Sequence, residues 1–356
     1  MTHISEFDYD LPAELIAQTP VEPRDSSRLM IVNRATHDVE ASHHFRDILD
    51  MIDPGDVLVL NTTRVIPARL PAIKPTGGAA EVLLLRPLTP TRWEALIGGK
   101  NLRVGSVLTF HGAAITAAVV LEKDGPVREI EFSEPPGDHL QSIGETPLPP
   151  YIHERVSDPE RYQTVYSREQ GSAAAPTAGL HFTPELLIGL RDKGVQFAHC
   201  MLHIGLDTFQ PVKVEQIEQH HIHSERAALS ATDAEIINRA KLAGRRIIAV
   251  GTTSARTLET AGLVSAGGDP AHPDLTPDAC PWRPVSAFNA DTRLYITPGY
   301  RWRVVDAMIT NFHLPKSTLL MMISSFGGHG LIRSAYETAK REHFRFFSFG
   351  DAMFII

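Results

Sequence analysis

The sequence predicts an α/β main domain that carries a smaller inserted all-β (barrel-like) domain. Three observations favour this class. Strand-like apolar runs alternate with helix-like segments at the start of the chain, short β runs separated by turns replace them from about residue 66 to 134, and helices and strands alternate again afterwards. We therefore assign residues 1–65 and 150–356 to one discontinuous α/β domain and residues 66–149 to the inserted domain.

The first α/β segment contains two helix-like and two strand-like stretches. "DLPAELIAQ" (10–18) and "HHFRDILDMI" (43–52) have helical apolar spacing, whereas "SRLMIV" (27–32) and "DVLVLN" (56–61) are apolar runs typical of buried strands. The insert has no helical period. Its strands are expected over 80–88, 92–98, 105–110, 113–122 and 127–133.

After the proline-rich "ETPLPPYI", helix and strand alternate again. Thr183, Pro184 and Glu185 have the form of an N-cap, a first-turn proline and a first-turn acid, so a helix is expected over 184–193. Further helices are expected over 232–243, 254–263, 317–326 and 331–341, and strands over 194–203, 246–250, 292–296, 302–310 and 346–356. Residues 265–284, rich in Pro, Gly and Ala, are expected to form an irregular loop.

Composition excludes several classes of protein. The 356-residue chain is 43% hydrophobic and 21% charged, as ordinary globular proteins are. It shows neither a secretory leader nor an apolar run long enough to cross a bilayer, so we expect a cytoplasmic protein. The cysteines, Cys200 and Cys280, argue against a disulfide framework, a zinc ribbon and an iron–sulfur cluster. The net charge of −8 does not indicate a nucleic-acid binder, so a phosphate track would require a local convergence of arginines and lysines.

The stretch "GSAAAPTAGLHFT" places small residues directly before His181 and a helix start. Small side chains let the backbone approach another element or a ligand closely. Taken alone, the stretch favours a buried structural histidine, which is the more common case, over a titrating one.

Polar residues also gather in "VGTTSARTLE" (250–259), where a buried strand meets a helix. Free amides and hydroxyls at such a helix start suit a carboxylate or phosphate, although ordinary capping explains them equally well. The segment has neither a Walker lysine nor dinucleotide-type glycine spacing. "QHHIHSE" (219–225) suggests a metal site, but its spacing fits no common zinc pattern, which disfavours metal.

Three further stretches bring polar groups to predicted element ends. They are "EPRDSSRLM" (22–30), "NTTRVIPARL" (61–70) and "TNFHLPKS" (310–317). Each has a purely structural alternative, as a turn or as a capped core helix.

Together these stretches occur in the order and approximate spacing of one family. From about Phe7 to Ile356, the chain resembles the S-adenosylmethionine:tRNA ribosyltransferase-isomerases of queuosine biosynthesis. The resemblance rests on "EPRDSSRL", "GDVLVLNTTRVIPARL", "PLPPYI", "AAPTAGLHFT", "LHIGLDTFQPV", "VGTTSARTLE", "TNFHLPKSTLLMMISSF" and "FRFFSFGDAM". The chain departs from the family pattern at Asp207, where glycine is common.

The resemblance implies transfer and isomerisation of the ribosyl group of S-adenosylmethionine onto 7-aminomethyl-7-deazaguanine at the tRNA wobble position. The products would be epoxyqueuosine in tRNA, adenine and methionine. S-adenosylmethionine is then a consumed substrate, and no metal or separate redox cofactor is implied. The expected partner is the anticodon arm of tRNA, no membrane is involved, and a monomer is the expected state.

Such a reaction needs a base, an acid for the leaving adenine, and dipoles near developing oxyanions. In this context we predict that His181 transfers a proton or holds a reacting group, with His223, Glu225 and His313 as the other catalytic candidates. The predicted substrate-binding residues are Arg24, Asp25, Arg28, Asn61, Arg64, Thr177, Thr252, Thr253, Ser254, Arg256, Asn311 and Lys316. Arg256 and Lys316 would neutralise the methionine carboxylate or tRNA phosphates, and the alternative for both is a structural ion pair.

Two other classes stay open. One is a tRNA-binding or regulatory protein that keeps the fold without turnover. The other is an ordinary S-adenosylmethionine methyltransferase, although its glycine-rich turn after an early strand is not evident. Product analysis distinguishes the three classes. Release of both adenine and methionine would indicate ribosyl transfer, methylated RNA would indicate methyl transfer, and unchanged RNA would indicate simple binding.

Overall fold

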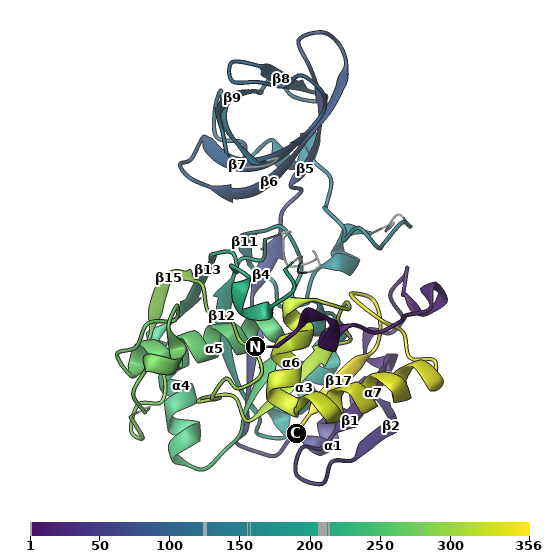
Figure 1. Ribbon diagram of the computed structural model, residues 1–356, viewed down its shortest axis with the longest axis vertical. Coiled ribbons are helices and arrows are strands. Elements are labelled where there is room, and N and C mark those ends of the chain that lie inside the picture. Colours follow the sequence, from purple (N-terminus) through teal and green to yellow (C-terminus); the bar gives the residue numbers. More distant parts are fainter. Residues whose placement is uncertain are drawn as a thin grey trace. The chain divides into compact units, whose positions relative to one another are not determined.

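The computed structural model describes residues 2–123, 127–154, 156, 158–205, 212, 214–278 and 280–356. The chain divides into two compact units (Figure 1). The sheet unit comprises Met1–Thr63, Pro150–Glu169 and Ala175–Ile356, and the barrel unit comprises Arg64–Pro149 and Gln170–Ala174. Two short strands, β4 (Thr63–Val65) and β11 (Glu169–Ser172), pair where the chain passes from one unit to the other.

The sheet unit is built on a nine-stranded sheet. Its strand order is β15 (Phe288–Thr292), β13 (Glu225–Leu229), β12 (Gln196–Leu202), β3 (Val57–Asn61), β14 (Ile247–Val250), β16 (Ala307–Asn311), β17 (Ala352–Ile355), β1 (Arg28–Val32) and β2 (Val39–His44). β12, β3, β14 and β16 are parallel, and β17 and β1 run in the opposite direction. The four parallel strands therefore end at one edge of the sheet, here called the carboxyl edge, where β17 and β1 begin.

The central strand β3 shows why both faces of the sheet are covered. All of its residues are buried. Val57 and Val59 belong to one hydrophobic cluster, and Leu58 and Leu60 belong to another. Because successive side chains of a strand point to opposite faces, this continuous apolar run requires a helical layer on each side.

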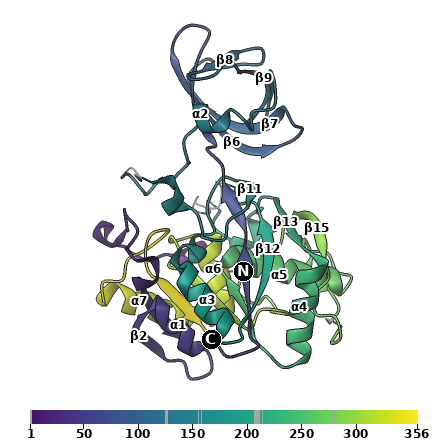
Figure 2. The same cartoon turned by 180° about the vertical axis from the view of Figure 1, so that it is seen from behind.

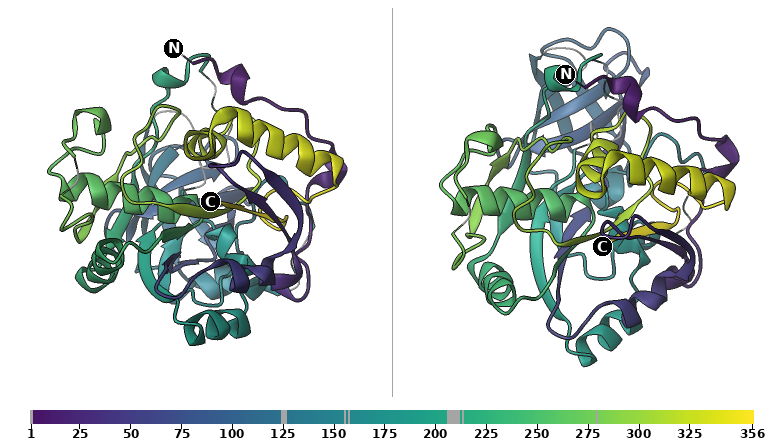
Figure 3. Two further views of the ribbon diagram at one scale, coloured as in Figure 1. Left: turned by 90° about the horizontal axis from the view of Figure 1, so that it is seen from below. Right: turned by 60° about the horizontal axis from the view of Figure 1, so that its bottom comes forward.

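The two helical layers contribute different apolar residues to these clusters. The layer on the face of Val57 contains α4 (Ala231–Leu242), α5 (Thr252–Ser265), α6 (Thr318–Gly327) and α7 (His329–Arg341). The opposite layer contains α1 (Ile48–Met51) and α3 (Pro184–Asp192). Figures 1 and 2 show the sheet unit from its two sides, and Figure 3 shows α7 (yellow) and α3 (teal) on opposite sides of the sheet.

The barrel unit is a closed antiparallel barrel. Its order is β10 (Val127–Phe132), β7 (Arg92–Gly98), β6 (Ala79–Pro87), β5 (Arg69–Ile73), β8 (Val107–Phe110) and β9 (Thr116–Glu122). In β8, Leu108 and Phe110 are buried in the barrel core while the alternate residues are exposed. α2 (Leu140–Ile143) packs two apolar residues on the same core. The predicted class, α/β with a barrel-like insert, is confirmed.

Two predicted N-terminal helices are wrong in whole or in part. Within residues 10–18 only Ala13–Leu15 forms a short 3-10 turn, because the backbone there pairs with Phe346, whose amide donates to the Leu15 carbonyl. Within residues 43–52, β2 continues to His44, and a 3-10 turn over Phe45–Asp47 precedes α1.

Two predicted strands are shorter than expected, and the one predicted over 292–296 is wrong, because β15 covers Phe288–Thr292 and shares only residue 292 with it. Over 302–310 only β16 forms, because the amides of residues 303–305 donate to the buried Glu259 carboxylate at 2.9–3.0 Å instead of joining the sheet. Residues 293–296 lie outside β15, with Leu294 and Ile296 buried as irregular chain. Residues 346–351 form a loop before β17.

The other predicted helices and strands are confirmed, with differences of a few residues at their ends. Thr183 caps α3 as expected, because its Oγ1 accepts a hydrogen bond from the Leu186 amide at 3.1 Å. Among the helices formed by described residues, none has both the length and the apolar character needed to traverse a bilayer.

Candidate active site

A pocket lies at the carboxyl edge of the sheet, beside the ends of β14 and β16. It holds about 560 Å³ of space, counting its open mouth. Its walls are formed by Tyr151, Ala175–Ala178, Ile204, Gly251–Thr253, Thr310–Leu314, Leu319, Phe347 and Ser348. We call it the threonine pocket, because three separate segments contribute threonines to its wall.

The small residues before His181 allow an unusually close approach of side chain to backbone. Thr177–His181 forms a 3-10 turn. A Cβ atom on Gly179 would lie 2.0 Å from the Tyr166 hydroxyl and 2.8 Å from Cγ2 of Thr164. Only glycine fits at this position, so packing explains part of the small-residue pattern, and the rest of the segment lines the pocket.

His181 is buried, with 5% of its surface exposed, and both of its ring nitrogens are engaged. Nδ1 lies 2.7 Å from Ser27 Oγ, and Nε2 lies 3.1 Å from Asn311 Nδ2. Asn311 Oδ1 in turn accepts a hydrogen bond from Thr177 Oγ1 at 2.9 Å. The Phe45 ring stacks on the imidazole with 4.9 Å between centroids. These contacts hold the imidazole in one orientation.

The hydrogen bonds of Asn311 determine the tautomer of His181. Asn311 Nδ2 also donates to the Phe347 carbonyl at 3.3 Å, and a carbonyl can only accept, so this end of the amide is the NH2 group. Its second hydrogen is donated to Nε2 of His181, which is therefore unprotonated. Nδ1 carries the ring proton and donates it to Ser27.

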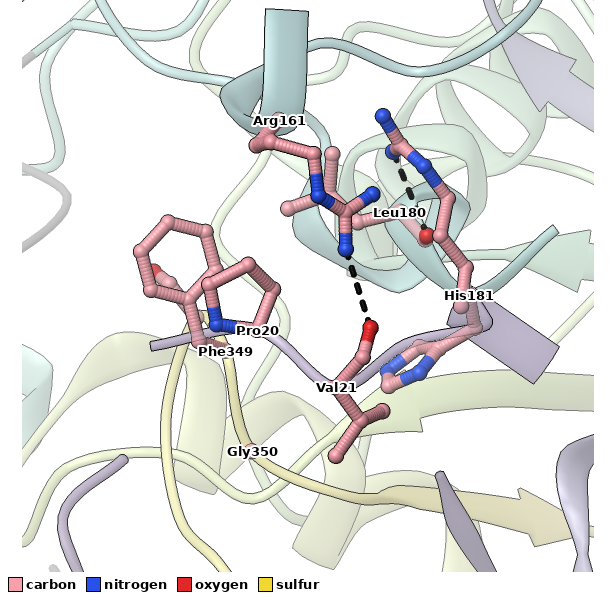
Figure 4. Close-up of a pocket in the computed structure, with 9 residues that line it drawn as sticks. Pro20, Val21, Arg161, Leu180, His181, Phe349 and Gly350 are labelled. Carbon is pink, nitrogen blue, oxygen red and sulfur yellow. Dashed lines mark hydrogen bonds between the residues drawn. The ribbon is translucent and has the colours of Figure 1, made fainter. Parts of the chain in front are cut away.

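His181 also borders a second, smaller pocket (Figure 4). We call it the arginine pocket. It is lined by Pro20, Val21, Arg24, Arg161, Leu180, His181 and Ser348–Gly350. Arg24 donates to the Gln163 and Leu180 carbonyls at 2.8 and 3.4 Å, and Arg161 donates to the Val21 carbonyl at 2.9 Å. The predicted residue Arg24 is thus beside His181, and its guanidinium holds neighbouring backbone.

Burial and nearby positive charge keep His181 neutral. Burial is the larger effect, and together with the charges of Arg345 and Arg24 it lowers the pKa of His181 to about 3. Burial, followed by the charge of Arg161, also lowers the pKa of Arg24. The tautomer inferred from the hydrogen bonds and the lowered pKa both describe an uncharged imidazole near pH 7.

His313 is a second buried imidazole, 8% exposed, in the wall of the threonine pocket. Its Nε2 lies 2.7 Å from Thr310 Oγ1. Its amide donates to Tyr336 Oη at 2.7 Å, and its carbonyl accepts from Tyr9 Oη at 2.5 Å. Burial lowers the pKa of His313 to about 3, so this ring is also neutral at pH 7.

The N-terminus of α5 lies at the same pocket. Gly251, with φ +88°, is the N-cap and offers no side chain to the helix amides. Thr252 and Thr253 line the pocket. Ser254 is turned inward, because its Oγ donates to the Val250 carbonyl at 2.8 Å.

Arg256 and Glu225 form a buried ion pair behind the pocket wall. Arg256 also donates to the His223 carbonyl at 3.2 Å. Glu225 Oε1 accepts from the amide of Gly205, which follows the pocket residue Ile204. Burial lowers the pKa of Arg256, and the charge of Glu225 opposes this shift. The ion pair therefore joins α5 to the start of β13, and Glu225 also holds the chain that follows β12.

Two predicted residues make backbone contacts outside both pockets. Asn61 ties the end of β3 to β12, because its Nδ2 donates to the Leu202 carbonyl at 3.1 Å and its Oδ1 accepts from the Leu202 amide at 3.2 Å. Arg28 stacks over the Phe344 ring at 3.8 Å and donates to the Glu342 carbonyl at 2.5 Å.

The other predicted residues are also not brought to a pocket. Asp25 lies 3.7 Å from Arg46, and Lys316 pairs with Asp8 at 2.7 Å. Arg64 lies in β4, at the start of the barrel unit. Lys316 has a left-handed backbone, with φ +54°, a conformation that is uncommon for a residue other than glycine.

The described residues form no group of three or more His, Cys, Asp and Glu side chains placed to hold a metal ion. In the histidine-rich stretch, His220 packs edge-to-face on Tyr295, with centroids 5.5 Å apart, and His223 is exposed. Asp207 lies outside the described residues.

Several residues of the site, among them Ser27, Tyr151 and Phe347, are absent from the sequence prediction. Ser27 contacts His181 from 154 positions away, and nothing in its local sequence marks that partner. Tyr151 and Phe347 form an aromatic wall with 4.7 Å between centroids. Their only sequence signal is that they lie in "PLPPYI" and "FRFFSFGDAM", two of the motifs that carry the family resemblance.

A pocket of buried hydroxyl, amide and imidazole groups at the ends of parallel strands is typical of an α/β enzyme that acts on a small polar ligand. The family model described as "queuosine biosynthesis protein" matches residues 4–355. The chain therefore belongs to the queuosine biosynthesis protein family.

A solved structure supports this assignment. The chain is similar to the crystal structure of an S-adenosylmethionine tRNA ribosyltransferase from Thermotoga maritima. The two sequences are 36% identical, and the match covers 99% of this chain and 100% of that chain, with a TM-score of 0.55.

Proposed function

We propose that this protein transfers and isomerises the ribosyl group of S-adenosylmethionine onto 7-aminomethyl-7-deazaguanine at the tRNA wobble position. The products are epoxyqueuosine in tRNA, adenine and methionine. The observation that carries the proposal is the family match along residues 4–355. The similarity to the Thermotoga maritima ribosyltransferase and the threonine pocket at the carboxyl edge support it.

The chemistry begins at the carbon next to the sulfonium. The positive sulfur makes the ribose 5′ carbon acidic, so a base can remove a proton there, and elimination opens the sugar ring and releases adenine. The aminomethyl nitrogen then bonds to the sugar. Ring rearrangement breaks the carbon–sulfur bond, expels methionine and closes the epoxide. Each well-placed proton transfer in such a sequence contributes about a hundredfold to ten-thousandfold.

We assign substrate contact to the threonine pocket. Thr177, Thr252, Thr253 and Asn311 present hydroxyl and amide groups to the sugar and the methionyl arm, and His313 presents a neutral imidazole that can accept a proton. This assignment rests on the pocket's lining residues and on the burial that keeps His313 uncharged.

Two roles are open to His181, and both depend on its contact with Asn311. Since Asn311 occupies Nε2, His181 can exchange a proton with substrate only if the substrate replaces that hydrogen bond; otherwise it orients the Asn311 amide. His223 and Glu225 remain second candidates for proton transfer, because Glu225 binds the Gly205 amide beside the pocket wall.

The discontinuous α/β segment, residues 1–65 and 150–356, is the proposed catalytic domain. The anticodon arm of tRNA is the proposed macromolecular partner of a monomeric, cytoplasmic enzyme that consumes S-adenosylmethionine as its second substrate. The predicted arginines, Arg24, Arg28 and Arg64, are proposed to contribute to phosphate attraction.

Product analysis tests the proposed function. Purified protein, S-adenosylmethionine and tRNA carrying 7-aminomethyl-7-deazaguanine should yield epoxyqueuosine after nuclease digestion, with equal amounts of adenine and methionine. The control is the same tRNA with guanine at the wobble position, which lacks the reacting amine. A methylated nucleoside as the sole product would overturn the proposal.

A further inference from the structure

The first turn of α5 leaves hydrogen-bond donors without acceptors. The first amides of an α-helix have no partner within the helix. In α3, α4 and α6 a Thr or Ser side chain accepts from one of them. In α5 the N-cap is Gly251, and no group in the described part of the chain accepts from the amides of Thr252, Thr253 or Ser254.

Two hydroxyls at this turn are also unsatisfied, which is an independent sign of a ligand. Thr252 is 7% exposed and lines the threonine pocket, and its hydroxyl has no hydrogen-bond partner among the described residues. Thr253 Oγ1 is buried without a partner. Further along the same helix, Thr257 and Thr260 donate to the carbonyl four residues earlier, at 2.9 and 2.8 Å.

Gly251 keeps these donors accessible. Its φ of +88° is a conformation that other residues rarely adopt. A Cβ atom there would lie 3.5 Å from Ala178 Cβ and 3.6 Å from Thr253 Oγ1. A capping serine or threonine at this position would be strained, and its oxygen would compete for the amides that Gly251 leaves open.

The electrostatics of the turn favour an anion. The N-terminus of a 14-residue helix carries a partial positive charge, and no acidic residue lies in its first turn. Arg256, one turn further on, is paired with Glu225, so among the described residues of this wall the charge available to a ligand is that of the helix end. Beyond the turn the pocket wall is apolar and aromatic, with Leu314, Leu319 and Phe347.

This combination suits a carboxylate attached to a less polar body. We propose that the first turn of α5 binds the carboxylate of the methionyl group of S-adenosylmethionine through its free amides and the hydroxyls of Thr252 and Thr253. The inference rests on the proposed function for the identity of the substrate. It adds which end of that substrate lies against α5.

Binding of a ligand pair that differs only in the carboxylate tests the subsite. Equilibrium dialysis measures the affinity for S-adenosylmethionine and for decarboxylated S-adenosylmethionine, without tRNA and with saturating tRNA that has guanine at the wobble position. Wild type should prefer S-adenosylmethionine by about tenfold or more, since hydrogen bonds to a charged group are the stronger ones. Thr252→Val and Thr253→Val should each lose about tenfold for S-adenosylmethionine and leave the affinity for the decarboxylated ligand unchanged.

Two control variants accompany this measurement. Thr257→Val removes a hydroxyl of the same helix outside the pocket and should leave both affinities unchanged, and Thr252→Ser keeps the hydroxyl and should restore the preference. Thermal unfolding verifies that each variant is folded. Equal wild-type affinities for the two ligands, or equal losses for both in the valine variants, would overturn the subsite. If such a wild-type protein still releases adenine from S-adenosylmethionine, the proposed function stands and only the subsite is wrong.

Discussion

The two buried imidazoles, His181 and His313, are neutral at physiological pH. Burial lowers both pKa values to about 3. A neutral imidazole can accept a proton or a hydrogen bond, but it supplies no charge to an anionic group. His181 differs from His313 because both of its nitrogens are already held, by Ser27 and Asn311.

Replacing His181 tests its role. His181→Ala should lower single-turnover rates by about a hundredfold or more at saturating substrates. His181→Asn keeps some hydrogen bonding but cannot accept and return a proton, so it should recover activity only if orientation is the role. His272→Ala, at an exposed loop histidine, is the control. Near-normal turnover in folded His181→Ala would leave His223, Glu225 and His313 as the better candidates.

Acidification should destabilise the folded protein through the same two residues. Between pH 6.5 and about 3 the unfolded chain binds protons at His181 and His313 that the folded chain does not bind. The free energy of unfolding should therefore fall as pH decreases in this window, by about 1.4 kcal/mol per pH unit for each imidazole. Urea unfolding between pH 7.5 and 5 measures this slope. A double variant, His181→Asn with His313→Asn, should flatten it, and an unchanged slope would contradict the burial argument.

For single residues, the sequence predicted which side chains lie at a pocket better than it predicted which residues contact one another. Thr177, His181, Thr252, Thr253, Asn311 and His313 all lie at a pocket. Ser27 was missed, because its contact with His181 spans 154 positions, and local patterns carry no information on such pairs. Arg28 has the expected charge for phosphate binding but caps backbone carbonyls.

Among the elements, the turn before α3 is tightly constrained by packing. Gly179 has the Tyr166 hydroxyl where a Cβ atom would be, at 2.0 Å. A side chain at residue 179 therefore requires the Tyr166 hydroxyl to move.

A double variant tests this constraint. Gly179→Ala should destabilise the protein by about 1–3 kcal/mol, because overpacking forces neighbouring groups to shift. Tyr166→Phe removes the hydroxyl, which makes no hydrogen bond among the described residues, so it should cost little alone and should recover part of the loss in Gly179→Ala. Chemical denaturation of the wild type, the two single variants and the double variant gives the coupling free energy between residues 166 and 179. Strict additivity of the two changes would contradict the proposed clash.

Helices and strands were predicted correctly where local sequence patterns determine them. The predictions failed where contacts with residues far away in the sequence determine the structure. The cap at Thr183 and the alternation in β8 follow from local pattern, and both are observed. The segment 302–306 has strand composition, yet its amides bind Glu259, a side chain from a different element. No periodicity in the segment itself could reveal that acceptor.

For the whole molecule, binding of the anticodon arm should depend on salt despite the net charge of −8. Phosphates that bind arginine and lysine release counterions, so the affinity should decrease as salt increases. Arg64→Ala should weaken binding. Arg24→Ala and Arg28→Ala should also lower stability, because both guanidiniums hold backbone carbonyls. An affinity that is independent of salt and unchanged in all three variants would contradict a basic binding face.

The most direct test of ribosyl transfer follows two labels of S-adenosylmethionine into tRNA. One preparation carries the label in the ribose carbons and the other in the methyl group, and each is incubated with the protein and tRNA bearing 7-aminomethyl-7-deazaguanine. The proposed function predicts that ribose label enters the wobble nucleoside while methyl label leaves with methionine. Methyl label in tRNA, with the ribose label left in solution, would contradict it.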